Sequence, residues 1–174
     1  MENYQGEASV VDIEQDAASL LTKAHFTISL AESCTGGLIS YRLTSISGSS
    51  AFFESCVVAY ANKVKRDILG VSAEILERYG AVSEPVARGM SEGVRRINNA
   101  DIGLSVTGIA GPSGGSSQKP VGTVFISLAF AGGTACRGYL FTGDRSSIRW
   151  QASQKALEWI CEHCRFQLSL ANND

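Results

Sequence analysis

The residues with the clearest chemical potential form the heptad Ala-Glu-Ser-Cys-Thr-Gly-Gly at 31–37. Apolar residues repeat every second position before it and at helical spacing after it, which predicts a strand, a tight turn and a helix. Because the first N–H groups of a helix lack intrahelical partners, this turn could bind a phosphate, a carboxylate or a developing oxyanion. Ser33 lies beside those groups, and Gly36 and Gly37 permit close approach of a ligand. The alternative is that Ser33 and Thr35 only cap the helix.

A nucleophilic serine needs a base, and the sequence offers lysine more readily than histidine. His25 and His163 show no recognisable pairing with the heptad, so a Ser-His-Asp triad is not supported. Lys63 and Lys65 follow the strongly apolar segment 56–61, where burial could keep a lysine amine neutral. The alternative is that both are solvated lysines on a helix surface.

Cys34 is a rival nucleophile beside Ser33, but it has no evident histidine partner, and we expect a packed thiol. The cluster Cys161-Glu162-His163-Cys164 falls inside a predicted helix and has no second cysteine pair. We expect packed thiols and a solvent-facing histidine there, with a metal site as the alternative. The sequence therefore predicts catalysis without a metal or other cofactor.

The composition limits the class of protein. The 174 residues, 44% hydrophobic and 18% charged, suit one folded domain with a core. A net charge of −2 without a run of lysine or arginine argues against nucleic acid and membranes as partners. The polar segment 1–6, expected to be flexible, does not resemble a signal peptide, and no apolar run could span a bilayer. Together with an odd number of scattered cysteines, which favours free thiols, this predicts a cytoplasmic protein.

The apolar periodicity alternates between helices and strands along the chain. It predicts a helix up to residue 24, strands at 26–30 and 56–61, helices at 72–79 and from 83, a strand at 102–106, strands at 121–130 and 134–141 joined at Gly132-Gly133, and a last helix capped by Asp144. Segment 56–61 is nearly continuous in apolar residues, as in a strand covered on both faces. The order predicts an α/β fold, a three-layer α/β/α sandwich with a mixed, mostly parallel sheet containing one hairpin.

In open α/β sheets, ligands bind where strands end and loops diverge. Polar or glycine-rich segments that could share one such edge surround Ser33, Ser50, Tyr60 and Thr107. The glycine-rich segment 107–115 contains neither a Walker A motif nor a Rossmann fingerprint. Arg145 and Arg149, four residues apart, could bind a phosphate or carboxylate, or could pair with acidic residues on a surface helix.

Several blocks follow one another in an order typical of one family. They are Ala-Glu-Ser-Cys-Thr-Gly-Gly at 31–37, Gly-Ser-Ser at 48–50, Val-Ala-Tyr-Ala-Asn at 58–62, Gly-Ala-Val-Ser at 80–83, Thr-Gly-Ile-Ala-Gly-Pro-Ser-Gly-Gly at 107–115, Lys-Pro-Val-Gly-Thr-Val at 119–124 and Gly-Asp-Arg at 143–145. Together they closely resemble the C-terminal domain of the competence-damage protein CinA. The stand-alone members of that family are nicotinamide-nucleotide amidases, which hydrolyse nicotinamide mononucleotide to nicotinate mononucleotide and ammonia.

The resemblance implies a single amidase domain over residues 1–174, with a nucleotide as its small-molecule substrate and no cofactor. A homodimer is expected, because members of the family are often dimers. The implied catalytic residues are Ser33, Lys65 and Tyr60, since Lys65 stands five residues after the tyrosine. Lys63 occupies a place where relatives often have an acidic residue. It could lower the pKa of Lys65 or point away from it.

The substrate-binding residues that we expect on the same basis come from the heptad, the loops and the last helix. They are Cys34, Thr35, Gly36, Gly37, Ser50, Thr107, Gly108, Arg145 and Arg149. Neutral Lys65 would take the proton of Ser33, with Tyr60 relaying or orienting it. The oxyanion would form near the N–H groups around Gly36, helped by Ser50 or Thr107. Arg145 is the first candidate for binding the 5′-phosphate and Arg149 the second.

Two other functions are compatible with the sequence. The domain could bind a nucleotide as a catalytically silent sensor or adaptor. It could instead be an amidase that acts on a different carboxamide.

Overall fold

A five-stranded mixed sheet forms the centre of the computed structural model, which describes residues 12–171. The strand order is β2-β1-β3-β4-β5. The strands are β1 (Ile28–Glu32), β2 (Phe53–Val58), β3 (Ile102–Gly108), β4 (Thr123–Phe130) and β5 (Gly133–Leu140). β1 is parallel to both β2 and β3, and the hairpin of β4 and β5 continues the sheet in antiparallel fashion. The segment 1–6, expected to be flexible, lies outside the described residues.

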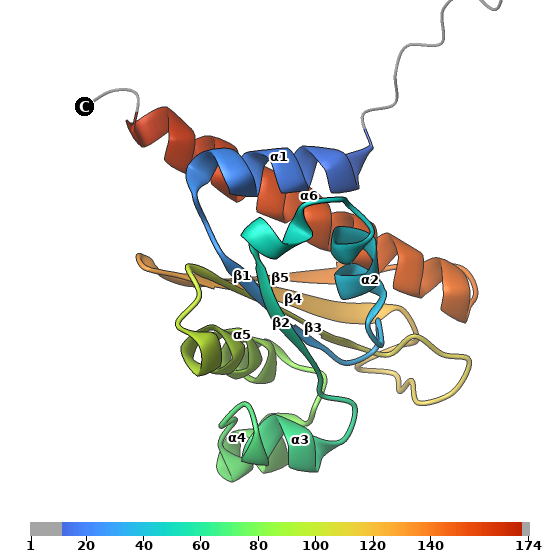
Figure 1. Ribbon diagram of the computed structural model, residues 1–174. Coiled ribbons are helices and arrows are strands. Elements are labelled where there is room, and N and C mark those ends of the chain that lie inside the picture. Colours follow the sequence, from blue (N-terminus) through green and yellow to red (C-terminus); the bar gives the residue numbers. More distant parts are fainter. Residues whose placement is uncertain (1–11, 172–174) are drawn as a thin grey trace, which may run out of the picture.

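Helices cover both faces of this sheet (Figure 1). On one face lie α1 (Ile13–Ala24), α2 (Leu38–Thr44) and α6 (Arg145–Ala171). On the other lie α3 (Asn62–Asp67), α4 (Ala73–Tyr79) and α5 (Glu84–Asn98). The predicted three-layer α/β/α sandwich is therefore confirmed. Among residues 12–171, we find no helix whose length and apolar content would let it cross a bilayer.

Local sequence signals place several element ends where the sequence predicts them. α4 begins after Ser72 and ends before Gly80, although the Ser72 side chain makes no capping hydrogen bond. At the start of α6, Asp144 Oδ1 accepts a hydrogen bond of 2.7 Å from the N–H of Ser147. The short turn at 131–132 joins β4 to β5, close to the expected position. These ends depend on local backbone chemistry, which a single sequence displays directly.

The expectation for segment 56–61 is wrong, because β2 is an edge strand and is not covered on both faces. It ends at Val58, whose side chain is 47% exposed. Ala59 is buried beyond the strand end, in a second core cluster that includes Leu69 and Val71. The first part of the apolar run, up to Val58, thus belongs to an edge strand, and Ala59 belongs to the second core cluster. All five residues of β1 are buried instead.

α5 packs against its neighbours so closely that glycine is required at two positions. A Cβ at Gly93 would lie 1.9 Å from the carbonyl oxygen of Leu69, and one at Gly103 of β3 would lie 2.2 Å from that of Ser91. Both neighbours are backbone atoms, so they cannot move aside as a flexible side chain does. This contact fixes α5, and with it the preceding segment 80–83, against the sheet.

Gly93→Ala should lower the free energy of unfolding by about 1–3 kcal/mol, because overpacking forces the backbone to shift. For a chain of this size, each kcal/mol corresponds to a fall of about 2–4 °C in Tm, measured by thermal denaturation. Gly89→Ala in the same helix is the matched control, since its Cβ would meet Val71 at an ordinary 3.4 Å. The control should gain about 0.5–1 kcal/mol from the better helix propensity of alanine. Equal effects of the two substitutions would refute the close packing.

Candidate active site

The candidate site lies at the edge of the sheet where the parallel strands β1, β2 and β3 end. Ser33 follows β1, Tyr60 follows β2, and Thr107 lies near the end of β3. These residues line a cavity of about 210 Å³ together with Cys34, Lys65, Ala81, Val82, Gly108, Ala110 and Arg145. Three of the four segments expected at one edge are therefore brought together.

Ser50 is the exception, and its expected role is corrected by the structure. It belongs to the short 3₁₀ helix η1 (Ser49–Ala51), which precedes β2, whereas Tyr60 follows that strand. Because β1 and β2 are parallel, Ser50 lies at the opposite end of the sheet from Ser33. It is exposed there and does not line the cavity.

The central contact joins Lys65 Nζ to Ser33 Oγ at 3.2 Å. Lys65 Nζ also donates to the carbonyl oxygens of Ala59 at 2.6 Å and Tyr60 at 3.3 Å. Lys65 is only 1% exposed, and this burial lowers the pKa of its amine. A neutral amine has two N–H donors and one lone pair. The two carbonyls can therefore take both donors, which leaves the lone pair for the Ser33 hydroxyl.

Lys63 takes no part in this contact. It lies on the exposed side of α3, whereas Lys65 is buried. Burial is the main cause of the lowered pKa of Lys65, and the Lys63 charge does not contribute to it. Of the two lysines that the sequence left open, Lys65 is thus the one that faces Ser33.

The cysteines behave as packed thiols. Cys34 is 5% exposed, and burial raises the pKa of its thiol to about 12, so it stays protonated at neutral pH. Cys161 and Cys164 are also buried, with thiol pKa values raised by burial to about 12. All five cysteines are free, as expected. His163 is half-buried and not fully solvent-facing as expected, and its ring lies 4.6 Å from that of Phe130.

The described residues hold no group of three or more histidine, cysteine or acidic side chains placed to bind a metal ion. In the suspected cluster at 161–164, Glu162 is engaged with Arg137. That cluster is therefore part of the packing of α6 against its neighbours.

The N-terminus of α2, expected to bind an oxyanion, is already filled by the carboxylate of Glu32. This carboxylate accepts hydrogen bonds from the N–H groups of Gly37 at 2.9 Å, Ile39 at 3.2 Å and Ser40 at 2.8 Å. The N–H of Gly36 donates to the Ser33 carbonyl at 3.1 Å. The oxyanion therefore cannot use the N–H groups around Gly36 as expected. Sequence reasoning missed Glu32, although an acidic residue before a turn into a helix is a recognisable capping signal.

Four residues expected to bind substrate build the turn instead. Gly36 and Gly37 adopt φ values of 61° and 91°, which favour glycine. Thr35 is completely buried, and its carbonyl accepts hydrogen bonds from Arg149 Nε at 3.2 Å and Nη2 at 2.6 Å. None of these four residues lines the cavity.

Arg145 and Tyr60 meet at the exposed side of the cavity. Tyr60 is 63% exposed, and its hydroxyl accepts a hydrogen bond of 3.1 Å from Arg145 Nη2. Arg145 Nη1 donates to the carbonyl of Gly111 at 2.9 Å. The tyrosine hydroxyl is therefore bound to the arginine, while Lys65 reaches Ser33 directly. A relay through Tyr60 is not required.

Thr107 fixes a part of the cavity wall that the sequence did not reveal. Its hydroxyl donates to the carbonyl of Ala81 at 2.8 Å, and Ala81 and Val82 line the cavity beside Gly108. The sequence signal that could have pointed to this segment is Gly80, because a glycine that ends α4 places residues 81 and 82 in a loop.

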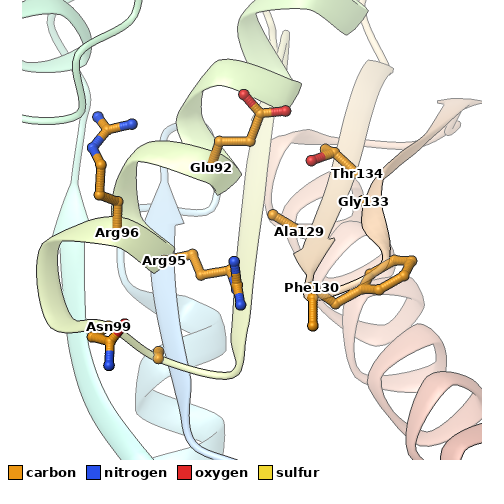
Figure 2. Close-up of a pocket in the computed structure, with 10 residues that line it drawn as sticks. Glu92, Arg95, Arg96, Asn99, Ala129, Phe130, Gly133 and Thr134 are labelled. Carbon is orange, nitrogen blue, oxygen red and sulfur yellow. The ribbon is translucent and has the colours of Figure 1, made fainter.

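A larger cavity of about 400 Å³ lies elsewhere, between the end of α5 and the hairpin (Figure 2). Arg95 extends from α5 toward Ala129 and Phe130 in this cavity, but no serine, cysteine or lysine lines it. Its residue Asn99 precedes β3, so this cavity lies at the end of the sheet opposite to Ser33. The smaller cavity is therefore the candidate active site.

Comparison with known proteins gives one consistent result. The family model described as the CinA C-terminal domain matches residues 10–164. A CinA-like protein of Syntrophus aciditrophicus is 56% identical over 146 residues, which cover 83% of this chain and 35% of the relative. A putative competence-damage inducible protein of Desulforudis audaxviator is 51% identical over 136 residues, covering 78% of this chain and 33% of the relative. The chain thus spans about a third of the length of these curated relatives.

Solved structures match over nearly their whole length. A competence-damaged protein (CinA) superfamily protein from Klebsiella pneumoniae has a TM-score of 0.86 at 33% identity, covering 89% of this chain and 97% of that one. The competence/damage inducible protein CihA from Agrobacterium tumefaciens has a TM-score of 0.82 at 39% identity, covering 92% and 97%. The mixed α/β sheet with helices on both faces is common to these proteins and this chain.

The burial of Lys65 predicts that its amine loses its proton below the ordinary lysine pKa of 10.5. The pH titration of the Cε signals of ¹³C-labelled lysine by NMR measures this directly, and the spectrum of Lys65→Met identifies the signal. A Lys65 signal that titrates at or above 10.5 would contradict the lowered pKa.

Proposed function

Because the chain belongs to the CinA C-terminal domain family, we propose that it hydrolyses nicotinamide mononucleotide to nicotinate mononucleotide and ammonia. Ser33 is the nucleophile and Lys65 the base. The observation that supports this most directly is the 3.2 Å contact between Lys65 Nζ and Ser33 Oγ at the cavity wall. A serine and a buried amine at this distance match the requirements of nucleophilic catalysis without histidine.

The first half of the reaction forms an acyl-enzyme. Neutral Lys65 takes the proton from Ser33 Oγ, and the oxygen attacks the carboxamide carbon. When the tetrahedral intermediate collapses, the C–N bond breaks and Lys65 returns the proton to the leaving ammonia. In the second half, Lys65 takes a proton from water, which attacks the ester. The C–O bond to Ser33 then breaks, and the serine regains its proton.

The oxyanion needs donors other than those bound to Glu32. In the turn, the backbone N–H of Cys34 donates to no oxygen among residues 12–171. We assign the oxyanion to this donor, because Cys34 directly follows the nucleophile and lines the cavity. Thr107 supports the cavity wall in this mechanism and does not donate to the oxyanion, since its hydroxyl is engaged with Ala81.

Substrate binding divides between the cavity and its exposed side. A cavity of about 210 Å³ suits a small ring with its carboxamide, while the ribose and the phosphate extend toward solvent. Arg145 is the phosphate-binding residue in this proposal, since its guanidinium lies there and is held by Tyr60 and Gly111. Arg149 is the weaker candidate in this proposal, because it does not line the cavity and its Nε and Nη2 both donate to the Thr35 carbonyl. The proposal includes a cytoplasmic homodimer, and free cysteines favour the reducing compartment.

Ser33→Ala should abolish ammonia release from nicotinamide mononucleotide while leaving Tm nearly unchanged. Lys65→Met should lower kcat by about 10²–10⁴-fold, the usual contribution of a general base. Lys63→Met is the matched control, because the exposed lysine is two residues away and should leave kcat unaltered. A coupled ammonia assay in the presence of a chelator measures all three variants.

Retained turnover by Ser33→Ala would exclude the serine as nucleophile. A larger loss in Lys63→Met than in Lys65→Met would show that the base is wrongly assigned. Binding of the nucleotide by wild type with no ammonia released would instead indicate a sensor or adaptor domain.

Arg145→Ala should raise KM for nicotinamide mononucleotide, because a charge-assisted contact to the phosphate is lost. The increase should be about 10-fold or more, which corresponds to a hydrogen bond between charged groups. With the dephosphorylated riboside, wild type and variant should have similar kcat/KM. If wild type hydrolyses nucleotide and riboside equally well, Arg145 does not bind the phosphate.

A further inference from the structure

The position of the nucleophile depends on a turn that is held from two sides by charged side chains. The N–H of Ser33 donates to the carbonyl of Val106 at 2.9 Å, so the start of the turn is fixed to β3. Beyond Ser33 the chain reverses through two glycines with positive φ before α2 begins. Glycine has few conformational restraints, so the remaining order of the turn must come from its contacts.

Glu32 restrains the far end of the turn. Its side chain is completely buried, and its two carboxylate oxygens accept three N–H groups, those of Gly37, Ile39 and Ser40. Burying a carboxylate costs free energy unless it is hydrogen-bonded. The buried Glu32 side chain therefore favours the backbone conformation in which these three N–H groups point at it. Through them, the residue before the nucleophile is joined to the first turn of α2.

Arg149 restrains the middle of the turn from the other side. It reaches from α6 and donates through both Nε and Nη2 to the carbonyl of Thr35. Its Nη2 also lies 3.6 Å from where a Cβ of Gly36 would be, so the guanidinium packs directly against the turn. Arg145, one helical turn earlier, contacts Tyr60 and Gly111 instead. The two arginines therefore have separate tasks.

We propose that Glu32 and Arg149 are positioning residues that together hold Ser33 and the N–H of Cys34 in the geometry for attack. Glu32 fixes the N–H groups at the end of the turn, and Arg149 fixes the carbonyl at its centre. Neither residue lines the cavity, so neither touches substrate there. The inference rests on the proposed function, because the geometry that they hold is that of the acylation step.

The kinetic test compares Glu32→Gln, Arg149→Gln and Arg149→Lys. Glutamine has one acceptor oxygen and a donor NH₂ group, so it cannot accept all three N–H groups that Glu32 binds. Both glutamine variants should lower kcat by about 10–100-fold, the range expected for a small misplacement of reacting groups. KM for nicotinamide mononucleotide should change by less than about 2-fold, because substrate contacts are retained. Arg149→Lys can still donate to the Thr35 carbonyl and should recover part of kcat.

A second readout does not require turnover of the nucleotide. A fluorophosphonate reagent labels activated serines, and mass spectrometry gives the rate at which Ser33 is modified. Glu32→Gln and Arg149→Gln should slow this labelling by about the same factor as kcat, because both depend on the position of the serine. Lys63→Met, whose side chain is exposed and takes no part in the turn, should label at the wild-type rate.

The outcomes separate this inference from the proposed function. Unchanged kcat and unchanged labelling in both glutamine variants would overturn it. A rise in KM in Arg149→Gln that disappears with the riboside would also overturn it, because Arg149 would then bind the phosphate. If wild type releases no ammonia from the nucleotide but is labelled at Ser33, and labelling depends on Glu32 and Arg149, the proposed function fails and the inference stands.

Discussion

One buried amine is central to the candidate site, and its surroundings supply two carbonyl acceptors and one hydroxyl. Ala59 and Tyr60 provide the carbonyls, and Ser33 provides the hydroxyl at 3.2 Å. Burial lowers the pKa of Lys65, so folding carries a cost at any pH where the amine is charged in the native state. That cost is fully present below the folded pKa and is relieved as the pH rises toward the ordinary value of 10.5. The burial that would let Lys65 act as a base thus lowers the free energy of unfolding.

The rest of the fold positions this amine and its partner. Ser33 follows β1, and the residues that carry the two carbonyls follow β2. Lys65 lies on the next element, α3, and its own carbonyl accepts the N–H of Val71 at 3.0 Å. Val71 and Leu69 belong to a small buried core, and Lys65 itself is only 1% exposed. The parallel direction of the strands brings these segments to one edge. A surface lysine on a mobile segment could not be held in this way.

The sequence predicted what depends on local chemistry and missed what depends on the direction and spacing of elements. The heptad at 31–37, the helix stop at Gly80 and the cap at Asp144 are local signals, and the structure has a turn, a helix end and a cap at those places. Ser50 was grouped with Ser33 because both are polar loop residues, whereas only the strand direction reveals their separation. Arg145 and Arg149 are equivalent in sequence, but they start one helical turn apart, about 5.4 Å along α6. Arg145 therefore contacts Tyr60 and Gly111, whereas Arg149 contacts the carbonyl of Thr35.

The central claim is that amide hydrolysis passes through an ester on Ser33 formed with the help of Lys65. The most direct measurement is single-turnover hydrolysis of nicotinamide mononucleotide in increasing hydroxylamine. An acyl-enzyme predicts that hydroxamate replaces nicotinate mononucleotide as the product, while the rate of ammonia release stays constant. Absence of hydroxamate, or ammonia release that accelerates in proportion to hydroxylamine, would contradict the claim.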